Sequence, residues 1–221
     1  MPHEPRIITL FSGGMDSATA LFLCLEEYGR EKVLALSFRY PSKHNAHELR
    51  AARNILKYLG PRAPAHRIID MTSCFEGSKS HLLRGGGEIP EGHYAADTMK
   101  LTVVPGRNLI FLSVAAALAE SLGAEKICIA AHHGDSHIYP DCRQPFLRAA
   151  DEAIALSAEG RVRLAAPFAG MGKNEIAVQG KRLGVPFALT RSCYKNQQRP
   201  CGKCGTCTER REALAAIGIV E

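Results

Sequence analysis

The chain has 221 residues, of which 46% are hydrophobic, enough for one ordinary core or one core with a small appendage. No apolar run reaches the roughly eighteen residues of a transmembrane helix, and the start of the chain lacks the features of a signal peptide, so we expect neither. The net charge of +6 is weak support for nucleic-acid binding, because aromatic residues make up only 6% of the chain and many bases cluster near its end.

Apolar, β-rich runs alternate with segments of helical spacing through most of the chain. Strands are expected at 6–11, 32–38, 66–70, 126–131 and 162–164. Helices are expected at 17–27, 46–59, 108–122, 146–157 and 174–183. This alternation predicts an α/β, Rossmann-like fold over residues 1–190, with a parallel sheet covered by helices on both faces. Residues 191–221 are expected to form a small tail packed on the same domain.

The stretch from residue 84 to residue 98 fits neither pattern. It contains the run Gly85-Gly86-Gly87, which indicates mobility. The sequence leaves two interpretations open, a lid or substrate loop and a surface insertion with no part in binding.

A glycine-rich turn follows the first predicted strand, with the sequence Ser12-Gly13-Gly14-Met15-Asp16-Ser17. The glycines allow backbone N–H groups to turn toward one point, and the start of the next helix adds its positive end. Ser12 and Ser17 supply hydroxyls, and Asp16 either holds Mg²⁺ or caps the helix. The turn lacks the lysine of a Walker A loop. It predicts a cradle for phosphate groups rather than a tight turn with a capping serine.

This turn resembles the phosphate loop of the N-type ATP pyrophosphatases, which cleave ATP between the α- and β-phosphates and so activate a carbonyl or carboxyl oxygen. A later element, Lys173-Asn174-Glu175, matches a Lys-x-Glu element of that superfamily whose lysine helps to hold the phosphates. The resemblance implies catalytic roles for Asp16 and Lys173. It implies that ATP contacts the loop, Lys173 and three residues at the ends of the first two strands, namely Leu10, Phe11 and Phe38.

Four of the eight cysteines gather near the end of the chain as Cys193, Cys201, Cys204 and Cys207. Their spacing suits four thiolates around one tetrahedral ion, with no open position for catalysis. We therefore expect one structural Zn²⁺ that holds the tail in place, and a redox pair or an iron–sulfur cluster is the alternative. Free thiols and a metal site are typical of a reducing compartment, which predicts a cytoplasmic protein.

Two further motifs narrow the resemblance, Val104-Pro105-Gly106-Arg107-Asn108 and Tyr139-Pro140-Asp141-Cys142-Arg143. Together with the phosphate loop and the cysteines, they resemble the 7-cyano-7-deazaguanine synthase family over residues 7–214. Members of that family convert 7-carboxy-7-deazaguanine and ammonia to the nitrile at the expense of ATP. The resemblance implies Mg²⁺ with the ATP, small-molecule substrates and a homodimer, and no membrane partner.

This chemistry needs groups that hold anions and a pocket for a flat heterocycle, but no nucleophile from the protein. The resemblance implies that Arg107 and Arg143 engage the carboxylate or the adenylate as catalytic groups. Asp135 and Asp141 are expected to accept hydrogen bonds from the heterocycle, and Tyr139 to stack on it. For each arginine and aspartate, an ion pair that only fixes a loop is the alternative.

The chain departs from the family pattern in two places. After the second strand the family has Phe-Asp-Tyr-Gly-Gln-x-His, whereas this chain has Phe38-Arg39-Tyr40-Pro41-Ser42-Lys43-His44. After the fourth strand, only Asp135 is kept from a Glu-Thr-Asp pattern. These departures put the acceptor in doubt and suggest a second hypothesis, an enzyme that stops at the amide or passes the activated carboxylate to an amine on a macromolecule.

Other interpretations attach to single features. His132, His133, Asp135 and His137 are either metal ligands or polar residues of a pocket, and Cys142 is a candidate nucleophile. An RNA-modifying pyrophosphatase and a degenerate nucleotide-binding module are two further classes. The first predicts a continuous basic face, and the intact phosphate loop with Lys173 argues against the second.

Overall fold

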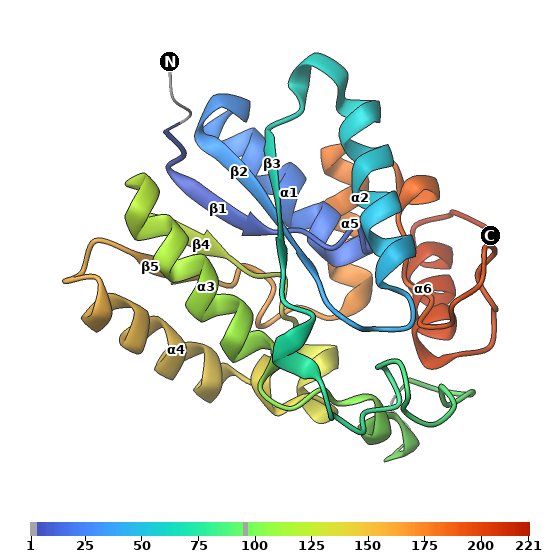
Figure 1. Cartoon of the computed structure of the whole chain (residues 1–221). Coiled ribbons are helices and arrows are strands. Elements are labelled where there is room, and N and C mark those ends of the chain that lie inside the picture. Colours follow the sequence, from blue (N-terminus) through green and yellow to red (C-terminus); the bar gives the residue numbers. More distant parts are fainter. Residues whose placement is uncertain (1–3, 95–96) are drawn as a thin grey trace.

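A computed structural model describes residues 4–94 and 97–221. Its centre is a parallel sheet with the strand order β3-β2-β1-β4-β5 (Figure 1). The strands are β1 (Ile7–Leu10), β2 (Val33–Arg39), β3 (Ala65–Asp70), β4 (Lys126–Cys128) and β5 (Arg163–Ala165). The helices are α1 (Met15–Tyr28), α2 (Asn45–Leu59), α3 (Arg107–Leu122), α4 (Gln144–Ser157), α5 (Lys173–Leu183) and α6 (Gly205–Ala215).

The two faces of the sheet bury two separate apolar clusters. Side chains alternate along a strand, so Ile7 packs on one face and Ile8 on the other. The Ile7 face is covered by residues of α1, α2, α5 and α6, and the Ile8 face by residues of α3 and α4. The predicted α/β, Rossmann-like fold with helices on both faces is therefore confirmed.

Every predicted strand and helix is present, with bounds shifted by a few residues. Helix α1 begins at Met15, which places Asp16 in its first turn. Strand β4 ends at Cys128, and residues 129–131, which were expected to continue it, line a cavity instead. Helix α6 has no counterpart among the predicted elements. It buries few apolar residues in the core, Ala213 and Leu214, so its sequence lacks a clear helical pattern of apolar residues.

The glycine-rich stretch at 84–98 is packed against the cysteine-rich tail, and residues 95 and 96 lie outside the described residues. Ile89 and Tyr94 are buried. Glu91 forms an isolated β-bridge with Cys204, and the Gly92 N–H donates to the Lys203 carbonyl at 2.9 Å. The described part of this stretch is thus anchored to the tail and contributes Tyr94 to the wall of a cavity.

Within residues 4–94 and 97–221, no helix has both the length and the apolar character needed to cross a membrane.

Candidate active site

The order of the strands brings two of the predicted segments together. β1 pairs with both β2 and β4. β2 and β3 are added on one side of β1 and β4 and β5 on the other, so the order of strand addition reverses between β1 and β4. In such sheets, ligands gather at the carboxyl ends of the strands at this switch point. A cavity lies there, lined from one side by the turn after β1 and from the other by residues after β4, including Ala131 and Asp135.

The turn after β1 is held in one shape by its own hydroxyls and by close packing. The Ser12 and Ser17 hydroxyls lie 3.0 Å apart, and the Gly14 N–H donates to Ser12 Oγ at 3.2 Å. Gly13 has φ +83, and a Cβ there would lie 2.5 Å from the backbone nitrogen of Ala52 in α2. Only glycine fits this position.

The tail reaches the turn directly. The Arg191 N–H donates to the Gly13 carbonyl at 2.9 Å. The Arg191 guanidinium donates to three backbone carbonyls of the loop that follows it, at Lys195, Gln197 and Gln198. A buried arginine therefore shapes the tail loop while its backbone braces the phosphate loop.

Lys173 lies between two carboxylates at the end of the cavity next to α1. Its ammonium is 2.6 Å from Asp16 Oδ2 and 3.2 Å from Glu209 Oε2, and the three side chains are 14–21% exposed. Burial by itself would raise the pKa of Asp16, but the Lys173 charge lowers it. Burial would likewise lower the pKa of Lys173, and the Asp16 and Glu209 carboxylates raise it. Lys173 is thus a firmly charged ammonium at neutral pH.

His132 and Asp135 extend this charged group, with His132 buried behind the cavity wall and Asp135 lining it. His132 is fully buried, and its Nε2 lies 3.3 Å from Lys173 Nζ and 3.4 Å from Asp135 Oδ2. The Tyr94 hydroxyl donates to Asp135 Oδ1 at 2.6 Å. The two oxygens of Asp135 therefore face a tyrosine from the glycine-rich stretch and a histidine next to Lys173.

The opposite end of the cavity is aromatic. The Phe38 and Phe111 rings stack with centroids 4.0 Å apart and an interplanar angle of 8°. The Arg107 guanidinium lies 6.0 Å from the centre of the Tyr139 ring and 3.5 Å from the Tyr40 hydroxyl. A cation beside flat apolar faces suits a planar ligand that carries an anionic group.

The structure brings most of the predicted site residues to this one cavity. Those that line it are Leu10, Phe11, Ser12, Gly14, Met15, Asp16, Ser17, Phe38, Arg107, Asp135 and Lys173. Gly13 contributes through its backbone.

Three predicted substrate residues, Tyr139, Asp141 and Arg143, do not line the cavity. Asp141 accepts the Asn108 N–H at 3.0 Å and so caps the start of α3. Arg143 is exposed and donates to the Ser136 carbonyl at 2.9 Å. Tyr139 is buried behind Arg107, with its hydroxyl 2.8 Å from that of Thr102. Around the short turn at 140–142, these side chains point away from the cavity. The proposed site therefore does not include Asp141 or Arg143, and Tyr139 contributes to it only by packing against Arg107.

Several cavity residues carry no signal in the sequence that would have singled them out. Glu48, Tyr94 and Tyr194 are examples. His44 also lines the cavity, but it belongs to the motif after β2 that resembles the family pattern. Glu209 belongs to no motif of the sequence. Its role becomes visible through its distance to Lys173, which depends on how α6 packs.

The histidines after β4 do not form a metal site with one another. His133 and His137 are exposed and lie edge to face at 5.7 Å, while His132 points inward. Cys142 is also unsuited to act as a nucleophile. It is buried, and burial with the nearby Asp135 and Asp141 carboxylates raises the pKa of its thiol.

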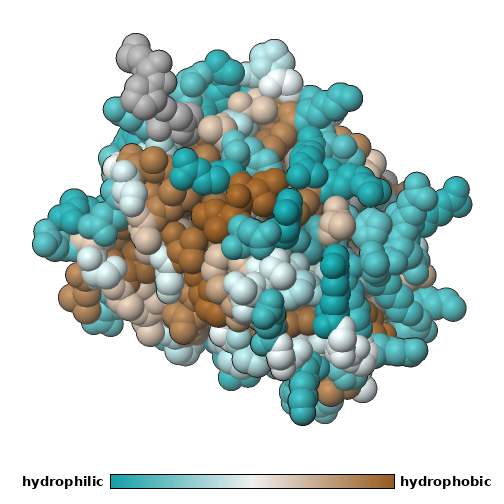
Figure 2. Space-filling view, viewed as in Figure 1, coloured by the Kyte–Doolittle hydropathy of each residue, from teal (hydrophilic) through white to brown (hydrophobic). Residues whose placement is uncertain are grey.

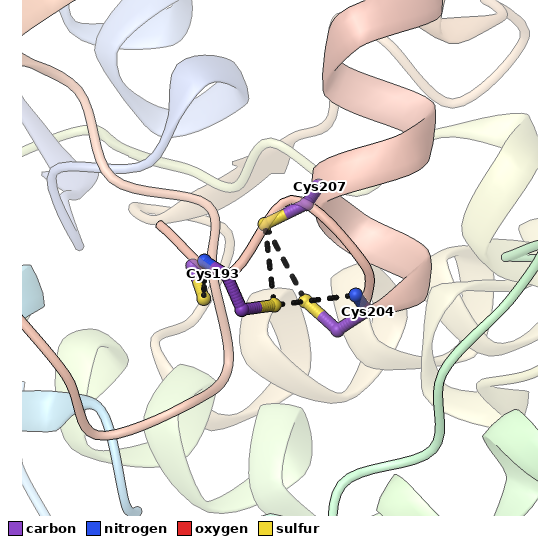
Figure 3. Close-up of side chains that lie close together, drawn as sticks. Cys193, Cys204 and Cys207 are labelled. Carbon is purple, nitrogen blue, oxygen red and sulfur yellow. Dashed lines mark hydrogen bonds between the residues drawn. The ribbon is translucent and has the colours of Figure 1, made fainter. Parts of the chain in front are cut away.

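The four cysteines of the tail meet at one point. Their sulfur atoms all lie within 4.8 Å of one another, and no other group of metal-binding side chains in the described ranges does the same. Figure 3 shows Cys193, Cys204 and Cys207 turned toward a common centre. Four sulfurs at about 2.3 Å from a tetrahedral ion would be about 3.8 Å apart. The measured separations of 3.5 Å for Cys204–Cys207 and 3.9 Å for Cys201–Cys207 fit that arrangement. The tail can therefore hold a metal ion.

The departures from the family pattern lie outside the cavity wall. After β2, the residues that keep the pattern, Phe38, Tyr40 and His44, line the cavity, whereas Arg39 does not. Arg39 faces Asp70 at 3.5 Å. After β4, Asp135 lines the cavity, and His133 and Gly134 do not.

The fold and the turn after β1 place the chain in the class of Rossmann-like α/β proteins with a pyrophosphatase-type phosphate loop. The structure of an NMN synthetase from Francisella tularensis covers 98% of this chain and 78% of its own with a TM-score of 0.52 at 16% identity, a likeness of fold alone.

A family model described as queuosine biosynthesis protein QueC matches residues 6–218. A 7-cyano-7-deazaguanine synthase from Porphyromonas gingivalis (strain W83) is 47% identical over 219 residues, 99% of this chain and 96% of the relative. One from Caldicellulosiruptor bescii is 44% identical over 214 residues, 97% and 94% of the two chains. The chain belongs to the QueC family, that of the 7-cyano-7-deazaguanine synthases.

Proposed function

We propose that this protein uses ATP to convert 7-carboxy-7-deazaguanine and ammonia to 7-cyano-7-deazaguanine. The observation that carries the proposal is the single cavity in which the phosphate loop, Lys173, Asp135 and Arg107 meet. Its place at the switch point of the sheet and the membership of the family support the same assignment.

The phosphate end of the cavity is where ATP would bind. The backbone N–H groups of the loop, the start of α1 and the Lys173 ammonium provide positive charge for the leaving pyrophosphate. Asp16 Oδ1 is buried and has no hydrogen-bond partner, as expected of an oxygen that completes its contacts with a bound ion. Asp16 would hold Mg²⁺ together with the phosphates, and that ion would neutralise charge as the α–β bond breaks.

The aromatic end is where the deazapurine would bind. Arg107 offers a partner for the carboxylate, and Asp135 an acceptor for the N–H groups of the heterocycle. Phe38, which the resemblance assigned to ATP, is here proposed to offer its flat face to the heterocycle instead. Since a reacting oxygen has to come within about 3–3.5 Å of phosphorus, the heterocycle has to extend from the aromatic end toward the phosphate loop. Both ends belong to one cavity, which meets this requirement.

The reaction then needs no nucleophile from the protein. A carboxylate oxygen attacks the α-phosphorus of ATP, and pyrophosphate leaves. Ammonia attacks the acyl adenylate, AMP leaves, and the amide forms with loss of one proton. A second attack, by the amide oxygen on ATP, again releases pyrophosphate. The C–O bond to AMP then breaks and the nitrogen loses its two remaining protons, which gives the nitrile. The residues of the cavity orient the reactants and stabilise anionic charge.

The metal of the cysteine site is proposed to be Zn²⁺ with a structural role. The site offers four sulfurs and no open position, and the short sulfur separations suit one ion rather than a cluster in which each cysteine binds its own iron. We also propose a cytoplasmic homodimer. Apolar surface is gathered around α3 in the view of Figure 2, and Leu109 of α3 is half exposed, which would suit a second copy.

The nitrile is the favoured product over the amide or a conjugate. The residues that depart from the family pattern do not line the cavity, whereas Phe38, Tyr40 and Asp135, which keep the pattern in the same two segments, do line it. The test is mass spectrometry of the products from 7-carboxy-7-deazaguanine, ATP, Mg²⁺ and ammonium. A nitrile with two AMP per product supports the proposal, whereas an accumulating amide with one AMP would replace it with the second hypothesis.

A further inference from the structure

Helix α6 connects the cysteine site with the ATP site. Cys204 is the residue before its first turn, and Cys207 lies within that turn. Two positions later, Glu209 reaches the Lys173 ammonium at 3.2 Å. Thr206, between the two cysteines, lines the cavity itself. One short helix therefore carries sulfur ligands on one side and active-site contacts on the other.

Lys173 is held by this helix and by α1 at once. Asp16 comes from the first turn of α1 and Glu209 from α6, and both carboxylates contact the same ammonium. A lysine has four rotatable bonds, so a single partner leaves it free to swing about that contact. Two carboxylates on different helices fix both the position of the ammonium and the direction of its one remaining N–H bond.

The place of Glu209 depends on the first turn of α6. Few apolar residues of this helix reach the core, chiefly Ala213 and Leu214 at its far end. The near end is held by the cysteines, by the β-bridge between Cys204 and Glu91, and by buried packing of Gly205 against Tyr94. Binding of one ion by all four sulfurs would lock this end, and its loss would leave four adjacent thiols to separate.

We propose that Glu209 is a positioning residue for Lys173 and that the metal at the four cysteines sets its position. The metal site then influences the ATP site, although none of the four cysteines lines the cavity. The predicted effect on turnover rests on the proposed function, whereas the link between metal, Glu209 and Lys173 does not.

The first test measures turnover in Glu209→Gln, which keeps the shape of the side chain and removes its charge. We expect kcat for pyrophosphate release to fall about ten- to a hundredfold, as for other groups that orient a primary ligand, while KM for ATP changes less than about threefold. Glu209→Asp restores the charge and should recover part of the loss. Glu212→Gln is the matched control, because Glu212 lies on the same helix, is 57% exposed and faces His93 at 4.0 Å.

All three variants should keep one metal ion per chain and an unfolding temperature close to that of the parent. A kcat within twofold of the parent in Glu209→Gln would overturn the proposal. So would a loss that Glu209→Asp does not relieve, or one that only follows a loss of metal.

The second test needs no substrate. Hydrogen–deuterium exchange of the segment 171–176, where α5 begins, is measured in the metal-loaded parent, in the parent after chelation, and in Glu209→Gln in both states. We expect chelation to speed exchange in the parent several-fold, Glu209→Gln to speed it while metal is bound, and chelation to add little in that variant. Unchanged exchange in Glu209→Gln, or an equal response of both proteins to chelation, would reject the proposed link between the metal, Glu209 and Lys173. This conclusion would hold even if the enzyme makes the nitrile. If the exchange rates change as expected but the protein makes no nitrile, only the proposed function would be rejected.

Discussion

The Lys173 ammonium lies 2.6 Å from the Asp16 carboxylate, although 157 positions separate the two residues in the chain. The contact joins the first turns of α1 and α5, which both start at the edge of the sheet where the cavity opens. It places a fixed positive charge beside the phosphate loop, and it makes each residue the main partner of the other.

We expect Asp16→Ala and Lys173→Ala each to lower ATP turnover by about 10²–10³, because each removes a group that faces developing charge. Their effects on stability should differ. Lys173→Ala leaves Asp16 and Glu209 without their shared cation, whereas Asp16→Ala leaves Lys173 with Glu209. Lys173→Ala should therefore unfold at lower denaturant than Asp16→Ala. Near-normal turnover in either variant would remove that residue from the proposed site.

Gly13→Ala should be more damaging than Gly123→Ala. Both glycines have positive φ, of +83 and +69, so both substitutions carry a backbone cost of about 1–2 kcal/mol. At Gly13 the new methyl would also meet the backbone of Ala52 at 2.5 Å and that of Glu48 at 2.7 Å, while at Gly123 nothing lies within 4 Å. We expect an extra loss of about 1–3 kcal/mol for Gly13→Ala, together with loss of ATP turnover. Denaturant titration measures the difference, and equal stabilities would contradict the close packing of the loop on α2.

Asp135→Asn should separate acceptor recognition from ATP binding. Asp135 lies in the cavity beyond Lys173, so ATP affinity should stay within a few fold while acceptor-dependent pyrophosphate release is lost. Asp141→Asn serves as the comparison, because Asp141 caps α3 and does not line the cavity. Because the asparagine oxygen can still accept the Asn108 N–H, the substitution should cost less than about 1 kcal/mol of stability, with little change in acceptor affinity. Calorimetry with ATP and steady-state kinetics with the acceptor check both outcomes, and an acceptor defect in Asp141→Asn would move the pocket toward the 140–142 turn.

Metal analysis should find one ion per chain, identified as zinc. Cys207→Ser removes one of four ligands and should lower both metal content and unfolding temperature. Cys74→Ser changes an exposed cysteine that is not part of the four-cysteine group and should leave both unchanged. Iron with inorganic sulfide in the purified protein would reject the zinc assignment.

Alkylation should distinguish the thiols by their surroundings. In the metal-loaded protein at neutral pH, iodoacetamide should modify the exposed Cys74 first. Cys142 should react only after unfolding, because it is buried and its pKa is raised, so little thiolate forms. Peptide mass spectrometry follows both sites. Early labelling of Cys142 would show that its thiol is accessible and reactive, and would make it a candidate nucleophile again.

The sequence by itself determined the features that depend on neighbours in the chain. Alternating strand and helix patterns predicted the parallel sheet, because each pattern reports which face of a segment is buried. The glycines of the phosphate turn were recognisable because a tight turn with positive φ restricts residue type locally. The cysteines predicted a metal site because ligand spacing within a short loop limits the geometry.

Only the tertiary structure decided which side chains share the cavity. Glu209 meets Lys173 because α6 packs beside α5, and Tyr94 meets Asp135 because the glycine-rich stretch folds over the tail. The same packing turned Asp141 toward the start of α3 and left Arg143 exposed, although both lie in the motif that indicated a substrate contact. A motif fixes the order of residues along the chain, whereas the direction of a side chain at a loop depends on contacts with segments far away in sequence.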